Sequence, residues 1–285
     1  YDLNGFEENP GLVVNNRYHF FNPKAGISYH HNGWSNYFSI GAGSKEPNRD
    51  DFEAGKQQQP KAERLYDLET GIGNKQKNYS WNAVLFYMRY KDQLVLTGKI
   101  NDVGAYTRTN IPESYRAGIE LEGTAMPVQW FTAAANLALS RSRVINFVEY
   151  IDDYDNGGQK TNGYHSTDIA LSPSVVSSAT LAVRPFRSAE VSLTGKYVGR
   201  QFLDNTGHES RSLEPYYVQD LRGSYDFAIK RLRVTVALQV NNLFNEKYEP
   251  NGYTYNYISN GALVVNNYYF PMAGTNLLFA VNLKF

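Results

Sequence analysis

The sequence predicts an all-β fold, an antiparallel β-barrel that spans a membrane, and three observations support this prediction. Residues 275–285 alternate apolar with polar or small side chains and end on an aromatic residue. The connections between the predicted strands alternate between short and long along the chain. Within several predicted strands, charged residues fall on one face and apolar residues on the other. These features fit a barrel whose outer face meets lipid and whose inner face meets water.

The closing segment shows the alternation most clearly. Successive side chains of a strand point to opposite faces, so one face carries Thr275, Leu277, Phe279, Val281, Leu283 and Phe285. The opposite face carries Asn276, Asn282 and Lys284. A half-buried strand of a soluble β-sandwich shows the same alternation, so this segment alone leaves both folds open.

Composition excludes a helical membrane protein but is compatible with a barrel. The mean hydropathy is -0.50 and 20% of the residues are charged. No apolar run approaches the roughly 20 residues that a spanning helix needs, whereas a barrel strand needs only about 9–11 residues with every second one apolar. The 23 tyrosines suit the aromatic girdles of a membrane interface. The formal net charge of zero gives no indication of a nucleic-acid partner.

Period-two segments between turn signals predict eleven strands. They lie near residues 21–30, 35–44, 64–74, 79–94, 105–124, 130–147, 173–185, 189–202, 216–227, 231–247 and 272–285. No segment shows a sustained helical period.

The predicted connections sort by length. Short turns fall at 31–34, 73–77, 126–129, 185–188 and 228–230, and Asn32-Gly33 suits a tight hairpin. Long loops fall at about 45–63, 95–104, 148–172, 203–215 and 248–271. Because adjacent antiparallel strands alternate in direction, all long loops lie at one end. Short periplasmic turns and long extracellular loops are typical of outer-membrane barrels.

Charge parity assigns the two faces of the wall. In the strand from Ala189, apolar Val191, Leu193 and Tyr197 alternate with a polar set of Glu190, Ser192, Thr194 and Lys196. A basic residue that faces lipid at mid-depth costs about 2–4 kcal/mol, so the polar face is expected to line the interior.

Strand direction predicts that part of the barrel lies outside these residues. With Phe285 on the periplasmic side, the first and last of eleven strands run parallel, and an antiparallel barrel cannot close on them. We expect residues 1–285 to be the C-terminal portion of one barrel domain, with about half the strands missing on the N-terminal side. The alternative is a miscount by one strand in region 105–147.

A series of motifs then resembles one family. Val240-Asn-Asn-Leu-Phe-Asn-Glu-Lys-Tyr248 resembles the N-N-L-F-(D/N)-x-x-Y signature in the penultimate strand of TonB-dependent outer-membrane receptors. Asn22-Pro-Lys-Ala-Gly-Ile-Ser-Tyr29 resembles the N-P-(R/K)-x-G-(L/I)-x-Y strand of that family. Further similar stretches follow in the family's order at 44–52, 60–71, 83–93, 115–122 and 195–200. The resemblance spans nearly the whole chain.

This resemblance implies a 22-stranded barrel occluded by an N-terminal plug, integral to the outer membrane, that takes up a scarce ligand such as a ferric siderophore. Corrinoid, haem or oligosaccharide are alternative ligands. The implied partners are the TonB complex through the plug region, outer-membrane lipid, the small-molecule ligand, and the missing N-terminal part of the same receptor. The loop and strand style resembles receptors of Bacteroidetes-type bacteria. Phe285 resembles the terminal aromatic residue by which barrel-assembly machinery recognises its clients.

The long loops supply the candidate ligand-binding residues. Tyrosine offers flat contact area and a hydroxyl group, which suit an iron chelate, a corrinoid or a sugar. The candidates are Tyr253, Tyr255, Asn256, Tyr257 and Tyr268, with Tyr154, Tyr106 and Arg108 on the same side. The alternative is that these side chains only pack the loops against their neighbours.

No enzyme, metal or cofactor site is predicted. The acidic turn 152–158 lacks the spacing of a calcium loop, and the histidines lack metal-ligand spacing. His165, Ser166 and Asp168 lie close in sequence, but no nucleophile motif surrounds them. An outer-membrane barrel hydrolase and a soluble glycan-binding sandwich are the alternatives from other classes.

Overall fold

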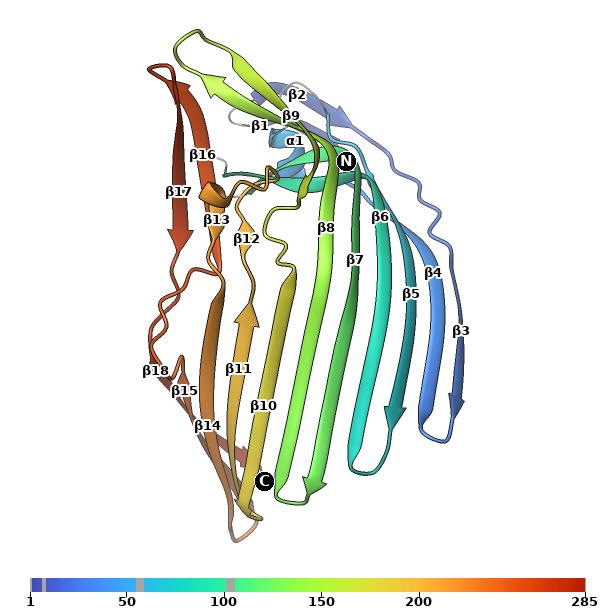
Figure 1. Ribbon diagram of the computed structural model, residues 1–285, viewed down its shortest axis with the longest axis vertical. Coiled ribbons are helices and arrows are strands. Elements are labelled where there is room, and N and C mark those ends of the chain that lie inside the picture. Colours follow the sequence, from blue (N-terminus) through green and yellow to red (C-terminus); the bar gives the residue numbers. More distant parts are fainter. Residues whose placement is uncertain (1, 7–8, 55–58, 101–105, 285) are drawn as a thin grey trace.

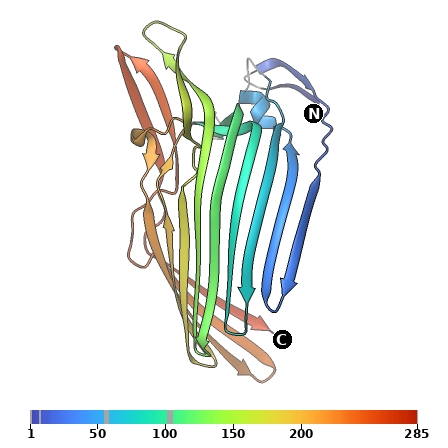
Figure 2. The ribbon, with the colours of Figure 1, turned by 45° about the vertical axis from the view of Figure 1, so that its right-hand side comes forward.

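The computed structural model describes residues 2–6, 9–54, 59–100 and 106–284. Its main body is one 14-stranded sheet, in which eleven strands form a continuous wall. The wall has the order β18-β15-β14-β11-β10-β8-β7-β6-β5-β4-β3, and all its neighbours pair antiparallel. The wall curves into an open trough (Figure 1, Figure 2). A soluble sandwich of two packed sheets is therefore the wrong architecture.

The eleven wall strands confirm the eleven predicted segments. They are β3 (Lys24–His31), β4 (Trp34–Lys45), β5 (Glu63–Lys75), β6 (Tyr79–Ile100), β7 (Tyr106–Val128), β8 (Phe131–Asp153), β10 (Val175–Phe186), β11 (Ala189–Val198), β14 (Tyr216–Ile229), β15 (Leu232–Asn241) and β18 (Asn276–Lys284). The main difference is length, because β6, β7 and β8 have 22, 23 and 23 residues and extend into the predicted loops. The predicted strand 189–202 also breaks after Val198.

The short connections between wall strands all lie at one end of the wall, as predicted. Five turns of two or three residues join β3–β4, β5–β6, β7–β8, β10–β11 and β14–β15. In the first of them, Asn32 and Gly33 have φ of 48° and 83°, the positive values that a two-residue hairpin turn requires. The longer connections lie at the opposite end, drawn at the top of Figure 1.

The long connections contain secondary structure of their own. These elements are β1 (Asp2–Phe6), β2 (Asn9–Asn15), α1 (Arg49–Ala54), β9 (Gln159–Asp168), β12 (Gln201–Phe202), the 3₁₀ turn η1 (Glu209–Arg211), β13 (Ser212–Leu213), β16 (Asn251–Ser259) and β17 (Ala262–Phe270). The helix α1 is too short to show a helical period, and a reciprocal cap starts it. Asn48 N donates to Asp51 Oδ2 (2.7 Å) and Asp51 N donates to Asn48 Oδ1 (3.0 Å). No helix among the described residues is long and apolar enough to cross a membrane.

The two edge strands of the wall run in the same direction. β3 leads into the first short turn, and β18 descends toward the same end while pairing antiparallel with β15. Within the described part of the chain, neither strand pairs with another strand on its outer side. The predicted odd strand count is confirmed, and the alternative of a miscount is wrong.

Register separates an apolar face from a polar face. Directly paired residues share a face, and one row crosses seven strands through Ile27, Phe38, Thr70, Leu85, Ile119, Leu139 and Val175. A second row crosses five strands through Leu181, Leu193, Leu221, Val240 and Leu277. The opposite face carries a hollow of about 290 Å³ whose polar lining includes Ser80, Glu122, Thr124, Asn136, Ser178 and Thr180. Register thus reproduces the two faces predicted from charge parity, and the lipid contact of the apolar face stays a prediction.

Candidate functional site at the long-loop end

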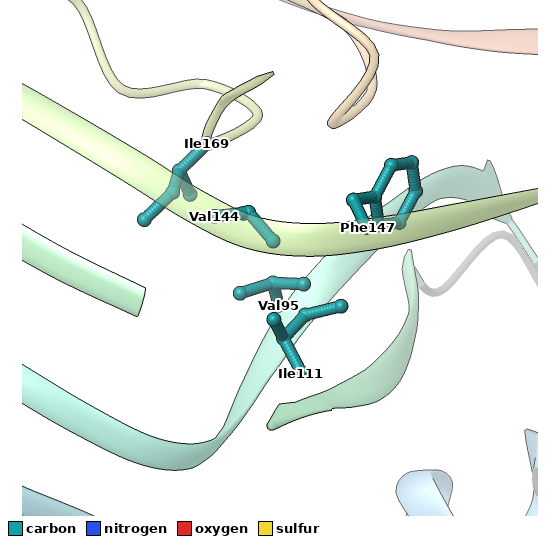
Figure 3. Packing of buried hydrophobic residues seen from close by; sticks show 5 residues of the cluster. All are labelled: Val95, Ile111, Val144, Phe147 and Ile169. Carbon is teal, nitrogen blue, oxygen red and sulfur yellow. The ribbon is translucent and has the colours of Figure 1, made fainter. Parts of the chain in front are cut away.

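A small hydrophobic core lies where the long strands extend beyond the rest of the wall. Val95 of β6, Ile111 of β7 and Val144 and Phe147 of β8 are buried together with Ile169 (Figure 3). Tyr164 of β9 packs against this core, with its ring 6.2 Å from that of Phe147. The core fixes the three strands to one another above the apolar rows and gives the loops a stable base.

A buried ionic cluster of Arg211, Glu149 and Asp204 joins three segments above this core. The Arg211 side chain is 2% exposed, and its Nη1 donates to Glu149 Oε1 and to Asp204 Oδ2 (2.9 Å). Glu149 also accepts a hydrogen bond from the Tyr164 hydroxyl (2.9 Å). The cluster therefore ties β8 and β9 to segment 204–211.

The environment of this cluster keeps its ionised groups charged. Burial alone would raise the pKa of Glu149, but the hydrogen bonds and the charge of Arg211 outweigh burial and lower it. Burial would lower the pKa of Arg211, but the two carboxylates outweigh it and raise it. Burial, followed by the hydrogen bond to Glu149, raises the pKa of Tyr164 to about 12.

The hairpin β16–β17 carries most of the predicted ligand-binding tyrosines. Along β16 the even-numbered residues from Gly252 to Ile258 are buried, and the tyrosines at 253, 255 and 257 are partly exposed on the opposite face. Tyr253 pairs with Tyr268 of β17, and their rings stack at 4.7 Å with an interplanar angle of 12°. The hairpin thus presents a row of aromatic rings on one side.

The turn after β8 docks onto this hairpin. β16 pairs in parallel with the end of β8, and Tyr154 N donates to Ile258 O (3.0 Å). The Tyr154 hydroxyl is hydrogen-bonded to that of Tyr255, and its ring lies 5.2 Å from the ring of Tyr257. We call Tyr154, Tyr253, Tyr255, Tyr257 and Tyr268 the aromatic loop pair. The hydrogen bond to Tyr154 is the largest cause, and burial the second, that raises the pKa of Tyr255 to about 12. The phenol of Tyr255 therefore stays neutral at physiological pH.

A carboxylate clamp holds the two loops together at their tips. Asp155 accepts hydrogen bonds from Asn260 N (2.8 Å) and Gly261 N (2.7 Å), the two turn residues between β16 and β17. Both turn residues have positive φ, at 53° and 74°. The carboxylate accepts hydrogen bonds from both backbone N–H groups of this turn. It therefore stabilises the observed turn geometry and also holds the hairpin against the loop that follows β8.

We expect Asp155→Ala to loosen this clamp. Hydrogen bonds to a charged group contribute about 1.5–3 kcal/mol each, reduced here by exposure to solvent, so the turn amides should exchange roughly tenfold faster. Amide hydrogen exchange of Asn260 and Gly261 in the complete receptor measures this. Asp155→Asn keeps one acceptor oxygen and should speed amide exchange less. Exchange at the wild-type rate in Asp155→Ala would exclude the clamp.

The structure brings together five of the predicted residues and separates the others. Asn256 is buried on the opposite face of β16, where it accepts a hydrogen bond from Thr254 Oγ1 (3.1 Å). Arg108 makes a two-pronged ion pair with Asp51 (2.7 and 3.0 Å), which fastens β7 to α1. The side chain of Tyr106 and the whole of Phe285 lie outside the described residues.

The carboxylate of Asp153 holds the acidic turn together through hydrogen bonds within the turn. Asp153 accepts hydrogen bonds from Asp155 N (3.1 Å) and from Asn156 N and Nδ2 (3.2 and 3.1 Å), and the bonds from Asn156 lower the pKa of Asp153. Asp155 is occupied by the hairpin turn. In the described ranges, no group of three or more His, Cys, Asp or Glu side chains has the arrangement of a metal site.

The chain belongs to the TonB-dependent receptor family. The family model described as "TonB dependent receptor-like, beta-barrel" matches residues 1–243. The barrels of this family are integral to the outer membrane, which fits the apolar outer rows and the sorted connections. In such barrels short turns are periplasmic and long loops extracellular, so we expect the aromatic loop pair to be extracellular.

Solved structures of known receptors share the same wall. The siderophore receptor PiuA from Acinetobacter baumannii has 16% identity and a TM-score of 0.65, over 90% of this chain and 35% of its own. The FrpB iron transporter from Neisseria meningitidis has 19% identity and a TM-score of 0.62, over 96% of this chain and 40% of its own. The copper transporter OprC has 13% identity and a TM-score of 0.64, over 90% of this chain and 38% of its own.

These likenesses establish the fold, and the chain spans only 35% to 40% of the length of the three receptors. No curated protein matches the sequence. The bacterial group suggested by the loop and strand style stays a prediction.

Proposed function

We propose that the chain is the C-terminal part of the barrel of an uptake receptor, which carries a scarce ligand such as a ferric siderophore across the outer membrane with energy from the TonB complex. The observation that supports this proposal most strongly is the aromatic loop pair, where loops from β8 and β16–β17 converge at the extracellular mouth of the wall. A ligand from outside the cell meets these side chains first.

The open wall supports a larger barrel. An unpaired backbone group in lipid costs several kcal/mol. The outer edges of β3 and β18, which pair with no other strand that the structure describes, therefore need further strands in the membrane. We infer that an N-terminal part of the same receptor supplies these strands, together with the plug and its contact with TonB. An even total strand number then follows for a closed antiparallel barrel.

The chemistry of the aromatic loop pair suits a chelate or another flat, polar ligand. Stacked tyrosine rings provide flat apolar contact, and neutral phenols provide hydrogen-bond donors and acceptors. Corrinoid, haem and oligosaccharide ligands share these needs and are the alternatives within the proposal.

Transport fits the site better than hydrolysis. His165 and Ser166 are adjacent in β9, so their side chains point to opposite faces of the strand. The carboxylate of Asp168 is engaged by Arg143 at 3.2 Å. This geometry gives no support to a triad of these three residues.

Deletion of residues 250–268 from the complete receptor should abolish ligand uptake and leave the barrel folded. Uptake is measured in cells with a panel of iron-55 catecholate and hydroxamate complexes, haemin, cobalt-57 cyanocobalamin and a labelled oligosaccharide, which also separates the alternative ligands. Unchanged uptake of the transported compound would rule out this loop as a ligand contact.

Single tyrosines provide a sharper test of the same proposal. Tyr253→Ala and Tyr257→Ala should each weaken binding of the transported compound roughly tenfold, because aromatic anchors at binding sites commonly contribute more than about 1 kcal/mol. Tyr269→Ala is the matched control, since Tyr269 is exposed on the other face of β17. Equal effects of all three substitutions would contradict the assigned binding face.

A further inference from the structure

The outer face of the wall carries a group of basic residues at its extracellular end. Register places Tyr66, Arg89, Tyr115 and Arg143 in one row across β5 to β8. The row above it contains Arg64, Lys91 and Glu113, and the row below contains Leu68, Tyr87, Ala117 and Arg141. The next row down is the apolar row through Leu85 and Leu139, so these side chains share its face. We call Arg64, Arg89, Lys91, Arg141 and Arg143 the outer basic patch.

The depth of this patch matches the level of lipid headgroups. On the outer face of β6, the aromatic residues Tyr79 and Trp81 mark the periplasmic end, and Arg89 lies ten positions beyond Tyr79. Ten residues of strand span about 33 Å, which a tilt of roughly 40° reduces to about 25 Å of height. That height equals the usual apolar band of an outer-membrane barrel, so Arg89 and Lys91 lie at its extracellular boundary.

The protein neutralises this patch only in part. Arg89 is paired with Glu113 at 2.5 Å and Arg143 with Asp168 at 3.2 Å. Arg64, Lys91 and Arg141 are exposed and form no ion pair with any residue that the structure describes. Lys91 has Arg64 as its register partner on β5, and on β7 it faces Glu113, which is already paired with Arg89. Like charges that face each other across two strands are destabilising. An anion from outside the chain would relieve this repulsion.

We propose that the outer basic patch binds the phosphate groups of an anionic lipid in the extracellular leaflet, a glycolipid with a phosphorylated headgroup. Guanidinium groups bind phosphate through paired charge-assisted hydrogen bonds. Tyr66, Tyr87 and Tyr115 stand between the basic side chains, with the rings of Tyr87 and Tyr115 at 6.1 Å. Such interfacial rings contact the sugar and the upper acyl chains of a bound glycolipid. The site rests on the outer-membrane location and is independent of the transported ligand.

Native mass spectrometry of the complete receptor in detergent tests this site. The probes are bisphosphorylated lipid A, its dephosphorylated form and inorganic phosphate. We expect the wild type to retain bisphosphorylated lipid A, and the double variant Arg64→Gln and Lys91→Gln to bind it roughly tenfold more weakly, because each basic residue near an anionic lipid surface contributes to the attraction. Lys230→Gln with Arg231→Gln removes the same charge from a periplasmic turn and should leave binding unchanged.

A charge-preserving variant and the free anion complete the test. Arg64→Lys with Lys91→Arg keeps the charges and should restore most lipid binding, which distinguishes a charge effect from misfolding. Equal lipid binding by the Arg64→Gln, Lys91→Gln variant and the Lys230→Gln, Arg231→Gln variant would overturn the site. Binding of inorganic phosphate as tight as that of lipid A would assign the patch to a free anion and overturn the lipid proposal. Ligand uptake by the same variants measures the proposed transport function separately.

Discussion

Arg211→Met should destabilise the extracellular end of the receptor by about 3–5 kcal/mol, the cost of leaving buried charges without their partner. Methionine has a similar volume to the arginine stem, so packing changes little. The substitution instead strips Glu149 and Asp204, both under 10% exposed, of the cation that neutralises them. The loops that converge on this cluster should then open locally while the membrane wall stays folded.

Amide hydrogen exchange measures this opening. Leu203 N donates to Arg211 O at 2.8 Å, so its exchange monitors the segment directly. We expect exchange at Leu203 and in β9 to rise roughly 10²-fold to 10⁴-fold, the factor that corresponds to such a loss. Arg200→Met is the matched control, because among the described residues Arg200 pairs only with the exposed Glu209 and Glu214. This substitution should change stability by less than about 1 kcal/mol. Similar small effects of the two substitutions would show that the buried cluster does not hold the loops.

Phe279→Arg should impair assembly of the barrel far more than Asn282→Arg. Both residues are exposed on the last strand, so burial does not distinguish them. Register does, because Phe279 pairs with Leu238 on the apolar face, whereas Asn282 pairs with Thr235 on the polar face. An arginine that faces lipid near the bilayer midplane costs about 2–4 kcal/mol, and one that faces the lumen stays hydrated.

Refolding of the complete receptor into lipid vesicles at increasing urea concentrations compares the two variants. Phe279→Leu controls for loss of the aromatic ring and should behave nearly as the wild type. We expect the urea concentration at the midpoint of refolding to fall clearly for Phe279→Arg alone. An equal fall for Asn282→Arg would contradict the assignment of lipid and lumen faces.

The wall was predictable from sequence because its signals are local. Period-two alternation fixes the face of each residue, and turn residues such as Asn32 and Gly33 mark the hairpins. The loop hairpin β16–β17 left a similar signal, since tyrosines alternate with buried residues along β16 and Asn260-Gly261 forms its turn. Its place inside a long loop, between two wall strands, favoured an irregular loop over a hairpin.

The contacts that shape the candidate site depend on register between distant strands. Glu149 and Arg211 are separated by 62 positions, and Asp155 and Asn260 by 105. No local pattern links such residues, so the buried cluster and the carboxylate clamp could not be predicted. Tyr154 and the hairpin tyrosines were candidates because their residue type alone suggests binding, and the structure brings them together. Asn256 lies apart from them because the alternation along β16 places it on the buried face.

Labelling of single cysteines in intact cells tests the central claim most directly, namely that the long-loop end is extracellular and the short-turn end periplasmic. The chain contains no cysteine, so Thr161→Cys in β9 and Lys77→Cys in a short turn each add one exposed thiol to it. A maleimide that cannot cross the outer membrane should label Thr161→Cys in intact cells, and Lys77→Cys only after the outer membrane is permeabilised. Labelling of Lys77→Cys in intact cells, with Thr161→Cys protected, would contradict the account.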